Sequence, residues 1–94
     1  MNKYNVATVK GIQEVKGLVF EIGDYKIIMH DAIANDNITI SDYYYGVEIA
    51  ESINMKNVYE KAKNNLMKLT SDEYNKRMKG ILADNGIEHP VNEA

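Results

Sequence analysis

A histidine and an aspartate stand side by side at His30-Asp31, a pairing that supplies two metal ligands in many metal-dependent hydrolases. Further His and Asp residues must complete such a coordination shell. The only other histidine is His89, near the C-terminus. We therefore expect no metal at this position, and we place His30 at the end of a strand with its ring at the surface.

An oxygen-rich segment, Asn35-Asp36-Asn37, has the residue types of a calcium-binding loop. The EF-hand loop needs Gly at its sixth position and Glu at its twelfth. Counted from Asp31, those positions hold Asp36 and Asp42, so the spacing fails. All three residues of the segment favour turns, and we expect a turn between two strands here.

The sequence gives little support for nucleophilic or phosphate chemistry. Cysteine is absent, which excludes a thiolate zinc site and a cysteine nucleophile. The serines lack the G-x-S-x-G context of a nucleophile elbow. Gly11, Gly17 and Gly23 lack the G-x-G-x-x-G spacing and the following helix of a dinucleotide site. We therefore expect no enzyme, no catalytic residues and no cofactor.

Three consecutive tyrosines, Tyr43-Tyr44-Tyr45, are the most unusual feature of the chain. Along a strand, Tyr43 and Tyr45 would share one face and Tyr44 would lie on the other. Tyrosine is common in binding hot spots because it buries a large area with few rotatable bonds. We therefore name all three as candidate partner-binding residues. A core position beside Val47 is the alternative for Tyr43 and Tyr45.

Charge is unevenly distributed along the chain. Residues 1–54 hold four Lys against eight acidic residues, whereas residues 55–80 hold seven basic residues against three acidic ones. A basic segment can contact phosphates or an acidic protein, and the candidate residues for such contacts are Lys56, Lys63, Lys68, Lys76 and Arg77. A solvent-exposed helix face is the alternative, because Lys is a good helix former. The net charge of -3 and the presence of one arginine disfavour base recognition in DNA.

The first half of the chain must supply a sheet. Two apolar runs, Leu18–Ile22 and Tyr25–His30, flank Gly23-Asp24, which predicts a hairpin with a two-residue turn. Leu18, Phe20 and Ile22 then share one face. An earlier strand from Tyr4 to Lys10 completes the sheet, and the link through residues 12–16 extends it.

A change of parity follows the second turn. Ile38 and Ile40 occupy even positions, whereas Tyr43, Tyr45 and Val47 occupy odd ones. One straight strand cannot place both sets on the same face. The pattern therefore predicts a bulge or a tight turn at Ser41-Asp42. In total we expect four or five antiparallel strands within about residues 3–50.

The second half changes to a helical period. Apolar residues form one stripe at positions 55, 58, 59, 62, 66 and 69 and a second stripe at positions 74, 78, 81 and 82. Thr70-Ser71-Asp72-Glu73 fits a capping box that begins the second helix. Gly86 fits a glycine that ends it. We expect α-helices over about residues 55–69 and 71–85.

These patterns predict an α+β fold with an antiparallel sheet followed by two helices. Residues 1–86 form one domain, and residues 87–94 form a flexible C-terminal tail. No apolar run approaches the roughly 18 residues that span a bilayer, and the N-terminus lacks the apolar core of a signal peptide. We expect a cytoplasmic protein that does not bind membranes.

The function class that fits is a small non-catalytic protein-binding module. It would bind another protein through the tyrosine-bearing sheet or the second helix, and a second copy of the chain, giving a homodimer, is another candidate partner. Nucleic-acid binding by segment 55–80 is the alternative function. The eleven Asn, eleven Ile and ten Lys residues have AT-rich codons, typical of low-GC bacteria and their phages. The function could therefore be that of a phage or mobile-element inhibitor of a host protein, of the anti-CRISPR type.

Overall fold

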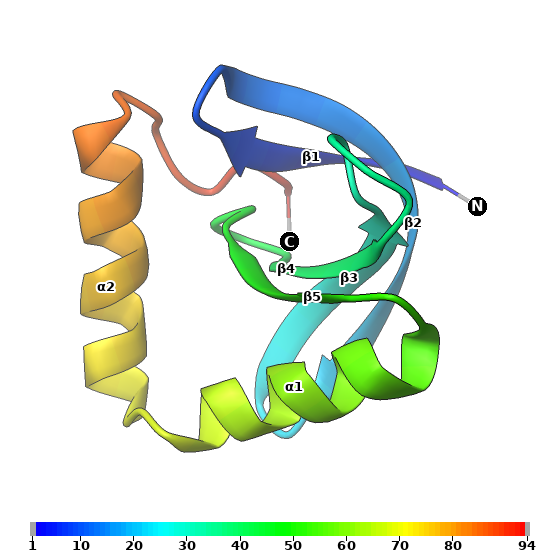
Figure 1. The fold of residues 1–94 in the computed structure, drawn as a ribbon. Helices are drawn as coiled ribbons and strands as arrows, with labels where there is room; N and C mark the ends of the chain where they lie inside the picture. Colours follow the sequence, from blue (N-terminus) through cyan, green and yellow to red (C-terminus); the bar gives the residue numbers. More distant parts are fainter. Residues whose placement is uncertain (1, 94) are drawn as a thin grey trace.

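A five-stranded antiparallel sheet precedes two helices in the computed structural model, which describes residues 2–93 (Figure 1). The predicted α+β fold is confirmed. The strands lie in the sheet in chain order: β1 (Asn2–Thr8), β2 (Gly11–Ile22), β3 (Tyr25–Asp31), β4 (Ile38–Asp42) and β5 (Glu48–Ser52). The helices are α1 (Met55–Met67) and α2 (Ser71–Asp84). No helix within residues 2–93 is long and apolar enough to cross a membrane.

The predicted hairpin connects β2 and β3. Ile22 pairs with Tyr25, so Gly23 and Asp24 are the two turn residues. Gly23 has a φ of 59°, which a residue with a side chain rarely adopts. Leu18, paired with Met29, lies on the same face as Ile22, four pairs further along the ladder.

The predicted break in parity is also present. The β4–β5 ladder shifts register between Ile40 and Ser41, and a turn containing Tyr43, Tyr44 and Tyr45 separates the two strands. The expectation that the tyrosines lie along a strand is therefore wrong. Tyr43 packs on one face of the sheet and Tyr45 on the other, because a turn releases consecutive residues from strict alternation.

Both helices begin at side-chain caps. The Asn54 side chain accepts a hydrogen bond from the backbone of Asn57, and Thr70 and Glu73 form the predicted capping box. Each helix buries one stripe in the same core, made by Val58, Ala62 and Leu66 of α1 and by Tyr74, Met78 and Leu82 of α2. The second helix thus packs on the main core, although it runs in a different direction from α1 (Figure 1).

The opposite face of the sheet has its own small core. Val6, Ile28 and Tyr43 are buried together there, with Tyr4, Val15 and Val19 packed around them. The curvature of the sheet brings β1 to the β4–β5 turn, where the Ala7 amide donates to the Gly46 carbonyl at 2.9 Å. The sheet therefore covers much of its second face by itself.

The C-terminal segment 87–93 runs back to the edge of β1 (Figure 1). Val91 is buried, and its amide donates to the Tyr44 carbonyl at 2.7 Å. The Asn92 side-chain oxygen accepts from the backbone N–H of Asn5 at 2.8 Å. The Asn92 side-chain nitrogen donates to the backbone carbonyls of Asn5 and Tyr43, also at 2.8 Å. The side chain thus supplies the bonds that a neighbouring strand would give to Asn5. Segment 87–93, expected as a flexible tail, thus makes specific contacts with β1 and with the tyrosine turn. Ala94 lies outside the described residues.

These contacts predict that Asn92→Ala lowers the free energy of unfolding by about 1–3 kcal/mol, because it removes three hydrogen bonds at a partly buried edge. Urea denaturation measures the change. Glu93→Ala is the matched control, since Tyr43 bonds only the backbone carbonyl of Glu93. Equal stability of the two variants would contradict this role of Asn92.

Candidate binding groove

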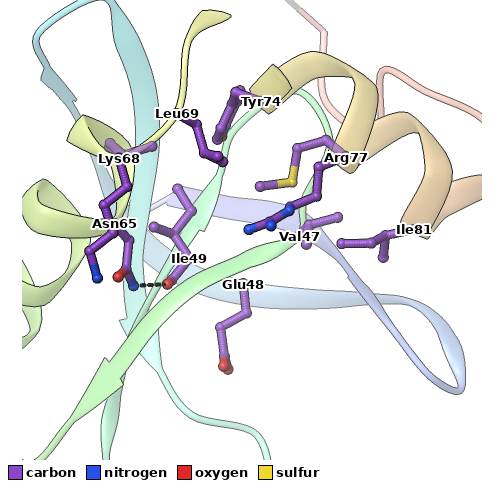
Figure 2. A pocket seen from close by; sticks show the side chains of 11 residues that line it. Val47, Glu48, Ile49, Asn65, Lys68, Leu69, Tyr74, Arg77 and Ile81 are labelled. Atoms are coloured by element: carbon purple, nitrogen blue, oxygen red, sulfur yellow. Dashed lines mark hydrogen bonds between the residues drawn. The ribbon is translucent and has the colours of Figure 1, made fainter. Parts of the chain in front are cut away.

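A groove of about 480 Å³ lies where β5, the end of α1 and α2 meet (Figure 2). Its floor is made by the buried side chains of Val47, Leu66 and Met78. Its walls include Ile49, Leu69 and Ile81, which keep part of their surface in solvent. Most of the lining is therefore apolar, as in typical ligand sites.

The groove exists because the two helices diverge. The capping box begins α2 only a few residues after α1 ends, so the chain turns sharply at Lys68–Thr70. Asn65 then donates its side-chain amide to the Ile49 carbonyl at 2.9 Å (Figure 2), and the Lys61 ammonium donates to the Glu51 carbonyl at 3.3 Å. These bonds occupy carbonyls on the outer edge of β5. The edge is therefore protected against pairing with another strand, and the groove suits side chains better than an added strand.

One buried carboxylate fixes α2 beside the groove. Asp42 is 3% exposed, and its Oδ1 accepts from the amides of Tyr44 and Tyr45, each at 2.8 Å. Its Oδ2 accepts from the Tyr74 hydroxyl on α2. Burial raises the pKa of Asp42, and these hydrogen bonds act in the opposite direction. Burial and the Asp42 charge also raise the pKa of the Tyr74 hydroxyl well above its usual range, so Tyr74 stays a donor.

Two of the five cationic residues predicted as binding residues line the groove. Lys68 and Arg77 line it, whereas Lys63 lines a neighbouring depression between α1 and the β2–β3 hairpin. Lys56 and Lys76 are exposed elsewhere on the two helices. The structure therefore does not gather the five residues into one basic surface.

Arg77 is the central charge of the groove. Figure 2 shows its guanidinium reaching across the groove toward β5, while the Glu48 side chain points away. Glu73, one turn earlier on α2, uses its carboxylate to accept from the Thr70 amide. Within residues 2–93, no salt bridge involves Arg77. The Arg77 charge helps to lower the pKa of Glu73, after the hydrogen bonds from Thr70. A guanidinium that makes no salt bridge above an apolar floor can still bind an anionic ligand.

The three predicted binding tyrosines have different environments. Tyr43 is 9% exposed, and the Lys26 ammonium lies 4.0 Å from the centre of its ring. Tyr45 packs against Tyr74 and donates its hydroxyl to Asn75 at 3.1 Å. Tyr44 is the most accessible of the three, with 37% of its surface exposed. The structure thus keeps Tyr44 as a surface residue and uses the other two mainly for packing.

His30 is buried on the opposite face, and the expectation of a surface ring is wrong. It is 6% exposed, with Nδ1 2.8 Å from the Asp31 carbonyl and Nε2 2.9 Å from the Ser41 hydroxyl. A carbonyl can only accept, so Nδ1 carries the proton and Nε2 accepts from Ser41. The partner is missed from sequence because it lies eleven residues away and meets His30 only through the β3–β4 pairing.

The His30–Ser41 pair has the bonding pattern of a histidine-activated nucleophile. However, Ser41 is only 2% exposed. Glu48 and Glu51 line the same pocket, and their negative charge would oppose a developing oxyanion. Within residues 2–93, no group of three or more His, Cys, Asp or Glu residues is arranged to hold a metal ion. The arrangement is explained best as a buried structural hydrogen bond.

Comparison with known proteins gives no relative from which a function could be transferred. No protein-family model matches the chain, and no significant match is found among the curated proteins or the solved structures. The function must therefore be argued from the chemistry of these surfaces.

The buried histidine predicts a pH dependence of stability. Burial lowers the pKa of His30 below 6.5 in the folded state, so the unfolded chain binds a proton more readily. The contribution of the neutral His30 ring to the free energy of unfolding is complete above about pH 6.5. It is lost as the pH falls through the pKa of His30 in the folded state. We expect the free energy of unfolding to fall less steeply below this pH in His30→Gln than in the wild type.

Urea denaturation at a series of pH values measures both slopes. Burial raises the pKa of Asp42 and of Glu48, which favours the folded state in acid, but both proteins share this contribution. The comparison therefore isolates His30. Identical slopes in the two proteins would show that the imidazole does not resist protonation in the fold.

Proposed function

We propose that this protein is a non-catalytic binding module that holds an acidic, apolar segment of a partner protein in the groove between β5, α1 and α2. The observation that carries the proposal is Arg77, whose guanidinium lies over an apolar groove with no salt-bridge partner in residues 2–93. The groove would take apolar anchors, and Arg77 would bind a carboxylate beside them.

The apolar lining supports a protein partner rather than a free ion. Leu69 and Ile81 keep accessible surface next to the buried Leu66 and Met78. A partner that covered them would gain roughly 25 cal/mol for each Å² of apolar area removed from water. Anchors in a desolvated pocket with charged contacts at the rim are the usual pattern of binding hot spots.

Charge selects the chemistry of the partner. Lys68 is the C-cap residue of α1 and Arg77 lies on α2, and both line the same groove. An Arg–carboxylate pair has two parallel hydrogen bonds, so it fixes orientation as well as sign. Acidic residues next to leucine-like anchors meet both demands, and a basic segment would be repelled.

The biological role that fits such a module is inhibition by occupying a surface of another protein. The low-GC composition of the chain supports a phage or mobile-element origin, with a host protein as the target. Nucleic-acid binding through segment 55–80 is the second candidate. It is favoured by seven basic residues in that segment but weakened by their distribution over separate surfaces.

The test uses a short fluorescent peptide with two leucines flanked by Asp and Glu, and measures its binding to the full chain by anisotropy. We expect saturable binding that weakens about tenfold or more in Arg77→Ala, since a hydrogen bond to a charged group contributes about 1.5–3 kcal/mol. Lys76→Ala, on the same helix but outside the groove lining, is the matched control and should stay within about twofold.

Three outcomes would contradict the proposal. They are no binding, equal binding of the peptide with Asn and Gln in place of its acids, and unchanged affinity in Arg77→Ala.

A duplex DNA probe tests the second candidate, nucleic-acid binding. For this function the logarithm of the affinity should fall with the logarithm of the salt concentration, with a slope of about -0.9 per phosphate contact. Light scattering coupled to size exclusion shows whether the protein forms a homodimer. If it does, and if Arg77→Ala dissociates the dimer, the groove is occupied by a second copy of the chain.

A further inference from the structure

A second cavity, of about 200 Å³, opens on the face of the sheet opposite the groove. Its polar lining is His30, Thr39, Ser41, Glu48 and Glu51, and its apolar lining includes Val6, Ala7 and Ile33. The volume suits one side chain or a small molecule rather than a larger ligand.

The bulge in the β4–β5 ladder creates the acidic side of this cavity. Glu48 and Glu51 are three residues apart, so a regular strand would point them to opposite faces. The register shift pairs Glu48 with Ser41 while Glu51 pairs with Thr39, which brings both carboxylates to one cavity. Within residues 2–93, neither carboxylate forms a salt bridge.

The two carboxylates are close enough to influence each other. Burial, with the charge of Glu51 as a smaller contribution, raises the pKa of Glu48. Glu51 is held in place because its Oε2 accepts from the side-chain amides of Asn37 at 3.2 Å and Asn35 at 3.4 Å. Glu48 is exposed and Glu51 is half-buried, so a positively charged group from outside can reach both carboxylates.

Thr39 is an independent sign of a ligand. It is 3% exposed and lines the cavity, and its hydroxyl makes no hydrogen bond to another residue in the 2–93 range. No fully enclosed side-chain polar atom in that range lacks a partner, so the Thr39 hydroxyl keeps some accessible surface, and the residue lines this cavity. A buried residue that offers its free hydroxyl to a cavity would bind a donor there.

We propose that this cavity binds a primary alkylammonium group. The ammonium has three donors, which can meet Glu48, Glu51 and the Thr39 hydroxyl. The alkyl stem would pack along Val6 and Ile33 on the apolar side. Such a group belongs either to a lysine side chain of a partner or to a free amine or diamine.

Other ligand classes fit the lining less well. An anion would meet two carboxylates. A bare metal ion would leave the apolar side without contacts, and no cluster of three suitable ligands for it exists among residues 2–93. A guanidinium is planar and needs more room than the narrow ammonium head.

The test is NMR titration of the full chain with n-pentylammonium chloride, followed through the amide signals of Thr39, Ser41 and Glu48 and the imidazole of His30. We expect saturable shifts that n-pentanol and sodium chloride do not produce. In the Glu48→Gln, Glu51→Gln double variant the affinity should fall about tenfold or more, and in Thr39→Val about fivefold. A double variant at the exposed Glu60 and Glu88 is the matched control.

The proposal is overturned if n-pentanol gives the same shifts, if magnesium chloride displaces the amine at equal concentration, or if the Glu48, Glu51 double variant binds as well as the wild type while its spectrum remains that of the folded protein. Cadaverine and Nα-acetyl-lysine methylamide distinguish the two sources of the ligand. Tighter binding of the diamine supports a free amine, and tighter binding of the lysine derivative supports a partner side chain.

This inference does not depend on the proposed peptide groove. The cavity and the groove lie on opposite faces of the sheet; Glu48 borders both, whereas Arg77 lines only the groove. Arg77→Ala should therefore leave amine binding unchanged. Loss of peptide binding with intact amine binding, or the reverse, shows which of the two proposals fails.

Discussion

The Asp42 carboxylate holds the sheet half and the helix half of this protein together. One oxygen closes the tyrosine turn by accepting two backbone amides, and the other accepts from Tyr74 on α2. A buried carboxylate is costly unless its oxygens have partners. The two amide partners belong to the turn itself, whereas the Tyr74 hydroxyl is available only when α2 lies beside the β4–β5 turn. The contact with Tyr74 therefore favours this position of the second helix.

The position of α2 determines the binding surfaces. With Tyr74 held at Asp42, α2 diverges from α1, and Arg77 lies over the floor made by Val47, Leu66 and Met78. The β4–β5 register shift allows the turn and also moves Glu48 to the opposite face. The β4–β5 connection therefore shapes two surfaces. On one face of the sheet it helps to form an apolar groove lined by Lys68 and Arg77, and on the other face it helps to form an acidic cavity.

Local patterns predicted much of the fold because local interactions decide those elements. The Gly23 hairpin, the Thr70 capping box and the parity break near Ser41 each depend on residues close in sequence. The groove, the buried His30 ring and the docking of Asn92 on β1 depend on contacts between distant segments. The sequence pattern indicated Lys68 and Arg77 as candidates, but only the tertiary structure shows that both line one groove.

Amide hydrogen exchange in the wild type and Tyr74→Phe tests most directly whether Asp42 positions the second helix. The variant keeps the aromatic ring and removes only the hydroxyl that Asp42 accepts from. If Asp42 positions α2, the amides of α2 should exchange faster in the variant than in the wild type, whereas the amides of β2 and β3 should keep their wild-type protection. Unchanged protection of α2, or an equal loss in every element, would contradict a specific role of this contact.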